Sequence, residues 1–200
     1  MLVERPEVAR KVRKVRPWDR LIASVVFRLR DRVDRYNAEL LLRTCADRGP
    51  GCELGRRAKL TGGASVHLGE NVHIGDNAFI RGEGGLWVGD NTHVSRNLVL
   101  YTMDHSFDGE RLPFDRARVH KPVRIGRNVF IGMNVVVAPG STIGDGAIIG
   151  MGTTISGTVP PLAVVVSPAW RQVGSRDADA YERLDHGRMY ASTDGMPYHP

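Results

Sequence analysis

A histidine stands where an otherwise regular sequence is interrupted. Residues 101–126 read YTMDHSFDGERLPFDRARVHKPVRIG, and His105 follows Asp104 near the start of this segment. A neutral imidazole accepts a proton near neutral pH and can return it, so histidine commonly serves as a general base. His105 is therefore the candidate catalytic residue; the alternative is an exposed loop histidine without a role. A backbone carbonyl, Asp104, Glu110 or Asp115 could orient its second ring nitrogen.

A six-residue repeat surrounds this interruption. From Ile125 onward, aliphatic residues open the hexads IGRNVF, IGMNVV, VAPGST, IGDGAI, IGMGTT and ISGTVP. Upstream, looser hexads run from Leu54, among them LGENVH, IGDNAF, VGDNTH and VSRNLV. Their phase slips by two residues at Val66–His67 and again at Leu86–Trp87. The first place is aliphatic, the second is mostly glycine, and the fifth is small or β-branched.

This template predicts an all-β solenoid. Side chains alternate along a strand, so the fifth place and the following first place face the same side, which we expect to be the interior. Glycine at the second place permits backbone angles that other residues resist, so we expect the chain to turn there. Three hexads then close one triangular coil, and neighbouring coils pair as parallel strands that stack their aliphatic residues into one core. The predicted repeat domain spans residues 54–166, with an inserted loop at 101–124.

The segments outside the repeat differ from it in kind. Residues 1–45 form a predicted helical arm, in which Leu21, Val25, Leu29 and Val33 share one face. We expect this helix to cap the first coil, which would otherwise expose a sheet edge. Residues 167–200 form a C-terminal extension that begins with a short helix and ends in a loose tail.

The positive charge of the protein belongs to the arm. Residues 1–43 hold 12 of the 28 lysines and arginines but only 6 of the 22 acidic residues, so the repeat domain is neutral. A basic amphipathic arm can associate with anionic lipid or an acidic partner, or its charges can simply be solvated. A neutral domain with few aromatic residues argues against nucleic acid as a partner. The sequence has no long apolar window and no secretory signal, so a cytoplasmic protein is expected, with the arm able to bind a membrane.

The repeat and its interruption resemble the hexapeptide-repeat acyltransferases. IGDGAIIGMGTTISGTVPPLAVVVSPAW and KPVRIGRNVFIGMNVVVAPG are similar to their closing coils. VGDNTHVSRNLVLYTMDH is similar to the histidine segment of the galactoside and maltose O-acetyltransferases, and HSFDGERLPF resembles the loop of the xenobiotic acetyltransferase branch. The resemblance implies a left-handed parallel β-helix, a homotrimer with active sites between subunits, acetyl-CoA as the donor, and His105 as the base that activates an acceptor hydroxyl.

The same resemblance implies binding residues. Backbone groups near the closing glycines and one following cation would hold acetyl-CoA; the matching positions are Gly132, Met133, Gly150, Met151, Ser156 and Arg171. Arg81 stands where galactoside-type members place an asparagine, so a carboxylate- or phosphate-bearing acceptor, such as a nucleotide- or lipid-linked sugar, suits this chain better than a neutral galactoside. Asp104 is the second candidate acceptor contact. The implied activity is O-acetylation of a saccharide, for the cell envelope or an exopolysaccharide; the alternatives are N-acetylation of an antibiotic or amino sugar, and a non-catalytic structural solenoid.

No metal site is expected. His73 and His93 fill the sixth place of their hexads, and we expect them to stack on one outer face in adjacent coils. No two histidines have the five-residue spacing that the zinc-binding β-helix proteins use. Cys45 and Cys52 do not form a CxxC motif and are expected to be small apolar residues.

Overall fold

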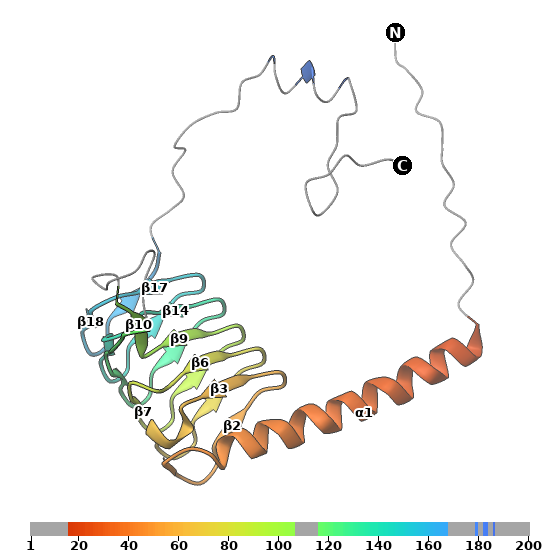
Figure 1. Cartoon of the computed structure of the whole chain (residues 1–200), viewed down its shortest axis with the longest axis horizontal. Helices are drawn as coiled ribbons and strands as arrows, with labels where there is room; N and C mark the ends of the chain where they lie inside the picture. The colour runs from red at the N-terminus through yellow and green to blue at the C-terminus, as the bar shows by residue number, and fades with distance from the viewer. Residues whose placement is uncertain (1–15, 107–115, 168–178, 180–181, 184–185, 187–200) are drawn as a thin grey trace. The chain divides into compact units, whose positions relative to one another are not determined.

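The computed structural model describes residues 16–106 and 116–167, with four separate residues near the C-terminus. The chain divides into two units, Met1–Ser167 and Pro168–Pro200. The first unit contains helix α1 (Pro17–Leu42) and a stack of short strands (Figure 1). In the second unit, the described residues have helical backbone where a short helix was predicted; they are Asp179, Glu182, Arg183 and His186.

The strands form three parallel sheets, which are the faces A, B and C of a triangular prism. Face A consists, in spatial order, of β1 (Asp47–Arg48), β4 (Val66–Leu68), β7 (Leu86–Val88), β12 (Val123–Ile125), β15 (Thr142–Ile143) and β18 (Thr158–Val159). Face B consists of β2 (Glu53–Leu54), β5 (His73–Ile74), β8 (His93–Val94), β13 (Phe130–Ile131), β16 (Ile148–Ile149) and β19 (Val164–Val165). Face C consists of β3 (Lys59–Thr61), β6 (Phe79–Arg81), β9 (Val99–Tyr101), β14 (Val136–Val137) and β17 (Thr154–Ile155).

The chain visits the faces in the order A, B, C in every coil, which confirms the predicted parallel β-helix, of left-handed type. The first coils are longer than three hexads: Asp47 pairs with His67, 20 residues later, and the 3₁₀-helix η1 (Gly63–Ser65) fills the corner before β4. The later coils have the predicted length, since Phe130 pairs with Ile148, 18 residues on. β1 already pairs with β4, so the solenoid begins before the predicted boundary at residue 54.

The core is the interior of the prism, as the hexad pattern predicts. The first-place residues Ile131, Val137 and Ile149 are buried, and so are the fifth-place residues Val135 and Ala147. Stacking of coils therefore replaces the layered packing of ordinary domains, and each coil covers the apolar edge of its neighbour.

The turns differ from the prediction. The backbone takes a positive φ at the fourth place of the hexad, where Asn77 (60°) and Asn134 (58°) stand, because asparagine tolerates this left-handed region. Second-place glycines have a different role: a Cβ on Gly132 would lie 2.7 Å from the backbone nitrogen of Met151 in the next coil. The second place thus needs glycine for the close approach of coils. The asparagines also form a ladder, in which Asn97 donates to Asn134 at 2.8 Å.

Helix α1 does not cap the first coil in the expected way. Only its last turns pack on the solenoid, through buried Ala38 and Leu42, the latter a member of the core. The predicted apolar face of Leu21, Val25, Leu29 and Val33 is exposed instead. In the part of the chain that the structure describes, no helix is long and apolar enough to cross a membrane.

The end of α1 is held by ion pairs that depend on pH. Hydrogen bonds from Arg48 and then Arg43 lower the pKa of Glu39 from 4.5 to about 2. A carboxylate with a lowered pKa stabilises the folded state above its ordinary pKa, and this contribution is lost as the pH falls from about 4.5 toward 2.

We expect the variant Glu39→Gln to have a slightly lower melting temperature than the wild type at pH 7, since exposed ion pairs contribute little. The difference should shrink below pH 4.5 and vanish near pH 2. Thermal unfolding of both proteins across this range measures it. A difference that stays constant with pH would contradict the role assigned to these ion pairs.

Candidate functional site

The regular winding is interrupted between β9 and β12, where the sequence predicts a loop. The chain leaves the prism at the corner between faces C and A, called corner CA, and returns through an antiparallel pair, β10 (Met103–His105) and β11 (Arg118–His120). His105 lies opposite Arg118 in this pair, and Met103 lies opposite His120. The ladder extends one step further, where Ser106 N donates to Ala117 O at 3.0 Å. A two-stranded projection therefore carries His105.

A buried threonine anchors the projection to the prism. The Thr102 hydroxyl donates to the carbonyl of Arg81 at 2.7 Å and accepts from the backbone N–H of Gly84 at 2.7 Å. The Thr102 carbonyl accepts from the N–H of Lys121 at 2.8 Å. Thr102 thus fixes both strands of the projection to the preceding coil. Sequence reasoning missed it, because a single threonine at the end of a strand carries no pattern.

His105 is half-buried at the end of β10, and its predicted neighbour Asp104 is exposed. The Asp104 carboxylate accepts a hydrogen bond from the backbone N–H of His105 at 2.8 Å, so this side chain shapes the backbone that holds the imidazole. The other predicted orienting residues, Glu110 and Asp115, lie outside the described residues.

A cluster of charges connects Arg81 to the projection. The sulfur of Met103 accepts from Arg81 Nη2 at 3.8 Å and from Arg118 Nη1 at 3.6 Å. Arg81 also forms an ion pair with Glu83, with 3.1 Å between Nη2 and Oε1, and its guanidinium lies 5.9 Å from the centre of the Tyr101 ring. The structure therefore places the predicted acceptor contact Arg81 at the base of the strand that carries His105.

The net charge of this cluster is positive. Burial raises the pKa of Glu83, but hydrogen bonds, chiefly from Arg81, outweigh it and leave that pKa below its ordinary value. Glu83 is therefore ionised at neutral pH and offsets the charge of Arg81. Arg118 forms no ion pair with any residue that the structure describes, so it adds an unpaired positive charge beside Met103.

The predicted acetyl-CoA residues gather only in part. Gly132, Met133, Gly150 and Met151 lie at the corner between faces B and C, called corner BC, in adjacent coils; Gly152 N donates to Met133 O at 2.9 Å. Met151 is 69% exposed. Ser156 follows β17 and lies at corner CA, and Arg171 is outside the described residues. Within one chain, the predicted donor edge and the His105 projection thus belong to different corners of the prism.

The outward histidines stack as predicted. The rings of His73 and His93 lie 4.5 Å apart in adjacent coils of face B, and His73 Nε2 bonds to Asn71 Oδ1 at 2.9 Å. On face A, His67 stacks on Trp87. Within the described ranges, no group of three or more His, Cys, Asp or Glu residues has the arrangement of a metal site.

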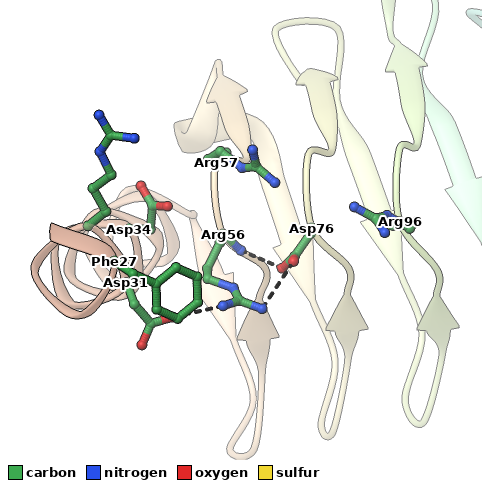
Figure 2. Close-up of a pocket in the computed structure, with 8 residues that line it drawn as sticks. Phe27, Asp31, Asp34, Arg56, Arg57, Asp76 and Arg96 are labelled. Atoms are coloured by element: carbon green, nitrogen blue, oxygen red, sulfur yellow. Dashed lines mark hydrogen bonds and ion pairs between the residues drawn. The ribbon is translucent and has the colours of Figure 1, made fainter. Parts of the chain in front are cut away.

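A hollow of about 700 Å³, not foreseen from the sequence, opens between α1 and the first coils (Figure 2). Arg56 crosses it and pairs with Asp31 of α1 at 2.8 Å and with Asp76 of the next coil at 3.4 Å. Because its central arginine is already paired with two carboxylates, we assign this hollow to the attachment of the helix.

Comparison with known proteins agrees with the class that these features define, the hexapeptide-repeat left-handed β-helix proteins. Residues 122–157 match the family model "Bacterial transferase hexapeptide (six repeats)", and residues 65–102 match "Hexapeptide repeat of succinyl-transferase". Both models describe transferases, which supports the acyltransferase class expected from the sequence. No curated protein sequence matches the chain significantly.

Solved structures share the fold. A galactoside acetyltransferase in complex with coenzyme A is 22% identical, with a TM-score of 0.59 over 95% of this chain and 92% of that chain. A hexapeptide-repeat acetyltransferase from Vibrio cholerae in complex with acetyl coenzyme A is 23% identical, with a TM-score of 0.61 over 76% and 85%. AntD, an N-acyltransferase from Bacillus cereus in complex with dTDP and coenzyme A, is 17% identical, with a TM-score of 0.54 over 75% and 94%.

Proposed function

We propose that this protein is an acetyl-CoA-dependent O-acetyltransferase that acts on a saccharide hydroxyl, with His105 as the general base. The observation that carries the proposal is the β10–β11 projection, which breaks the smooth prism once among the described coils and holds a half-buried histidine. A flat-walled solenoid offers no concave surface, so an excursion is needed to build a site for two substrates. The transferase family models and the acetyltransferase structures that share this fold add support.

The reaction is a direct transfer. Neutral His105 accepts the proton of the acceptor hydroxyl while the oxygen attacks the thioester carbonyl carbon; the carbon–sulfur bond breaks, and the proton passes to the thiolate to give coenzyme A. An acyl-enzyme on cysteine is disfavoured, since Cys45 and Cys52 pack against the core of the first coils and burial raises the pKa of the Cys45 thiol.

The acceptor binds beside Arg81 and Asp104 in this proposal. Arg81 and Arg118 flank Met103, and Glu83 neutralises one of the two charges. An acceptor with a carboxylate or phosphate suits this surplus, as in a nucleotide- or lipid-linked sugar. Such acceptors fit a cytoplasmic enzyme that decorates cell-envelope or exopolysaccharide precursors, with its N-terminal arm able to associate with the membrane.

The donor site requires a second subunit. Acetyl-CoA lies along Gly132, Met133, Gly150 and Met151, with Ser156 and Arg171 as further contacts. This edge is at corner BC, whereas His105 projects from corner CA. A site that uses both edges is most simply completed between neighbouring chains, which supports a homotrimer with three equivalent clefts.

A second candidate function is N-acylation of an amino sugar. One structure with this fold is an AntD variant in complex with dTDP-4-amino-4,6-dideoxyglucose and coenzyme A, at 16% identity and a TM-score of 0.50. The positive cluster near Met103 suits a nucleotide-linked sugar in either reaction, so the nature of the acceptor atom separates them.

Two measurements test the proposed function. Coenzyme A should stabilise the protein against heat by about 2.7 kcal/mol at 100 times its dissociation constant. Labelled acetyl-CoA should then be consumed with a panel of glycans, nucleotide sugars and amino sugars, and the product linkage identified as ester or amide. Failure of coenzyme A to bind would favour a non-catalytic solenoid, and an amide product would favour the second candidate.

We expect Met151→Glu to weaken coenzyme A binding about tenfold, because a carboxylate at this exposed corner repels the phosphates of the donor. The KM for acetyl-CoA should rise, while the melting temperature without ligand stays near that of the wild type. Leu162→Glu is the matched control, since Leu162 is 79% exposed on the last coil but lies between β18 and β19 at another corner. Equal loss of binding in both variants would contradict the placement of the donor.

A further inference from the structure

Helix α1 carries an exposed apolar stripe along most of its length. The stripe consists of Trp18, Leu21, Ile22, Val25, Leu29, Val33, Tyr36 and Leu40, and each of these side chains is at least 41% exposed. From Trp18 to Leu40 the helix rises about 33 Å at 1.5 Å per residue. A continuous apolar surface of this length on a protein marks a place where something binds.

The stripe faces away from the solenoid to which the helix is attached. Ala38, which is buried against the first coil, lies two positions from both Tyr36 and Leu40, or about 200° around the helix. Asp31, which pairs with Arg56 of the first coil, stands in the same relation to Leu29 and Val33. The contacts of the helix with its own domain therefore leave the whole stripe available to a partner.

Positive charges border and precede the stripe. Arg28 and Arg32 lie next to it on one side, are exposed, and form no ion pair with other described residues. Segment 1–15 adds five lysines and arginines against two glutamates. The first 43 residues carry a net charge of +6, while the rest of the chain is neutral. The partner must therefore offer an apolar layer next to dense negative charge.

We infer that α1 is an in-plane membrane anchor that binds anionic lipid bilayers. An amphipathic helix with Trp, Leu and Ile on one face and Arg beside it lies at the level of the headgroups, where the apolar face enters the acyl region and the arginines meet lipid phosphates. A second copy of the chain is the weaker occupant, since packing stripe on stripe would bring two arms of +6 together. The solenoid contacts the other side of the helix, so it stays in water.

Vesicle sedimentation of the full chain tests this inference. We expect binding to mixed phosphatidylcholine–phosphatidylglycerol vesicles, much weaker binding to phosphatidylcholine alone, and loss of the difference as NaCl rises to about 0.5 M. Leu29→Glu should lower the partition coefficient at least about tenfold, because burial of one leucine contributes that much or more.

Phe27→Glu is the matched control. Phe27 is 66% exposed on the same helix, but it lies two positions from Leu29 and so on the far face. This variant introduces the same charge and should bind vesicles nearly as the wild type does. The inference is overturned if the full chain ignores anionic vesicles, if both variants lose binding equally, or if Leu29→Glu changes the oligomeric state of a protein that does not bind lipid. None of these readouts depends on acetyltransferase activity.

Discussion

Replacing His105 with alanine is expected to slow acetyl transfer by about 10²–10⁴-fold, because a positioned general base contributes that much to a proton-transfer step. The loss should appear in kcat, since the imidazole acts on the acceptor proton in the transition state. Stabilisation by coenzyme A should persist, because the proposed donor edge lies at another corner of the prism. Steady-state release of coenzyme A with a responsive acceptor, together with thermal melting, measures both effects.

The facing strand offers a control for this experiment. His120 is exposed on β11, opposite Met103 in the same antiparallel pair, so His120→Ala perturbs the projection in a similar way without removing the proposed base. We expect it to retain most activity. Turnover by His105→Ala at the wild-type rate, or equal losses in the two variants, would refute the assignment of His105.

Truncating Ile149 to alanine should destabilise the fold by about 2–5 kcal/mol, the range for large-to-small changes in a packed core. Ile149 is fully buried, and its strand β16 pairs with β13 on one side and β19 on the other, so the cavity opens between stacked coils. Equilibrium unfolding by denaturant, with the slope checked for constancy, gives the difference in the free energy of unfolding.

Its neighbour serves as the control, since the chain has isoleucine at both positions. Ile148 points outward and is 43% exposed, so Ile148→Ala should cost far less than Ile149→Ala. Similar costs for the two variants would mean that the alternation of the hexad does not set the inside of the prism.

Much of the solenoid could be predicted from the sequence because its rules are local. A strand has a two-residue period, so an aliphatic residue at the first place and a small one at the fifth define an interior wherever they recur, as Ile131 and Val135 show. The stacked pair His73–His93 followed from the same alternation. The turns were assigned to the wrong place, because the demand at Gly132 comes from the next coil, which a single hexad does not contain.

The site was only partly predictable, since it depends on contacts between distant segments. The interruption and its histidine are visible in the sequence, but the anchoring of both strands by Thr102 and the meeting of Arg81 with Arg118 at Met103 are not. Likewise, the apolar stripe of α1 was predicted as a face, whereas its direction was predicted wrongly, because amphipathicity states that a face exists and not what it contacts.

By itself, the sequence determined the repeat, the parallel β-helix, the position of the interruption and the charge asymmetry between arm and domain, because each is written in residue types at short, regular spacing. Only the tertiary structure decided which corner each group occupies. Coils of 20 residues give way to coils of 18, and the projection leaves at corner CA while the glycine–methionine edge runs along corner BC. These placements result from closing the chain around a shared core, where every coil takes its position from its neighbours.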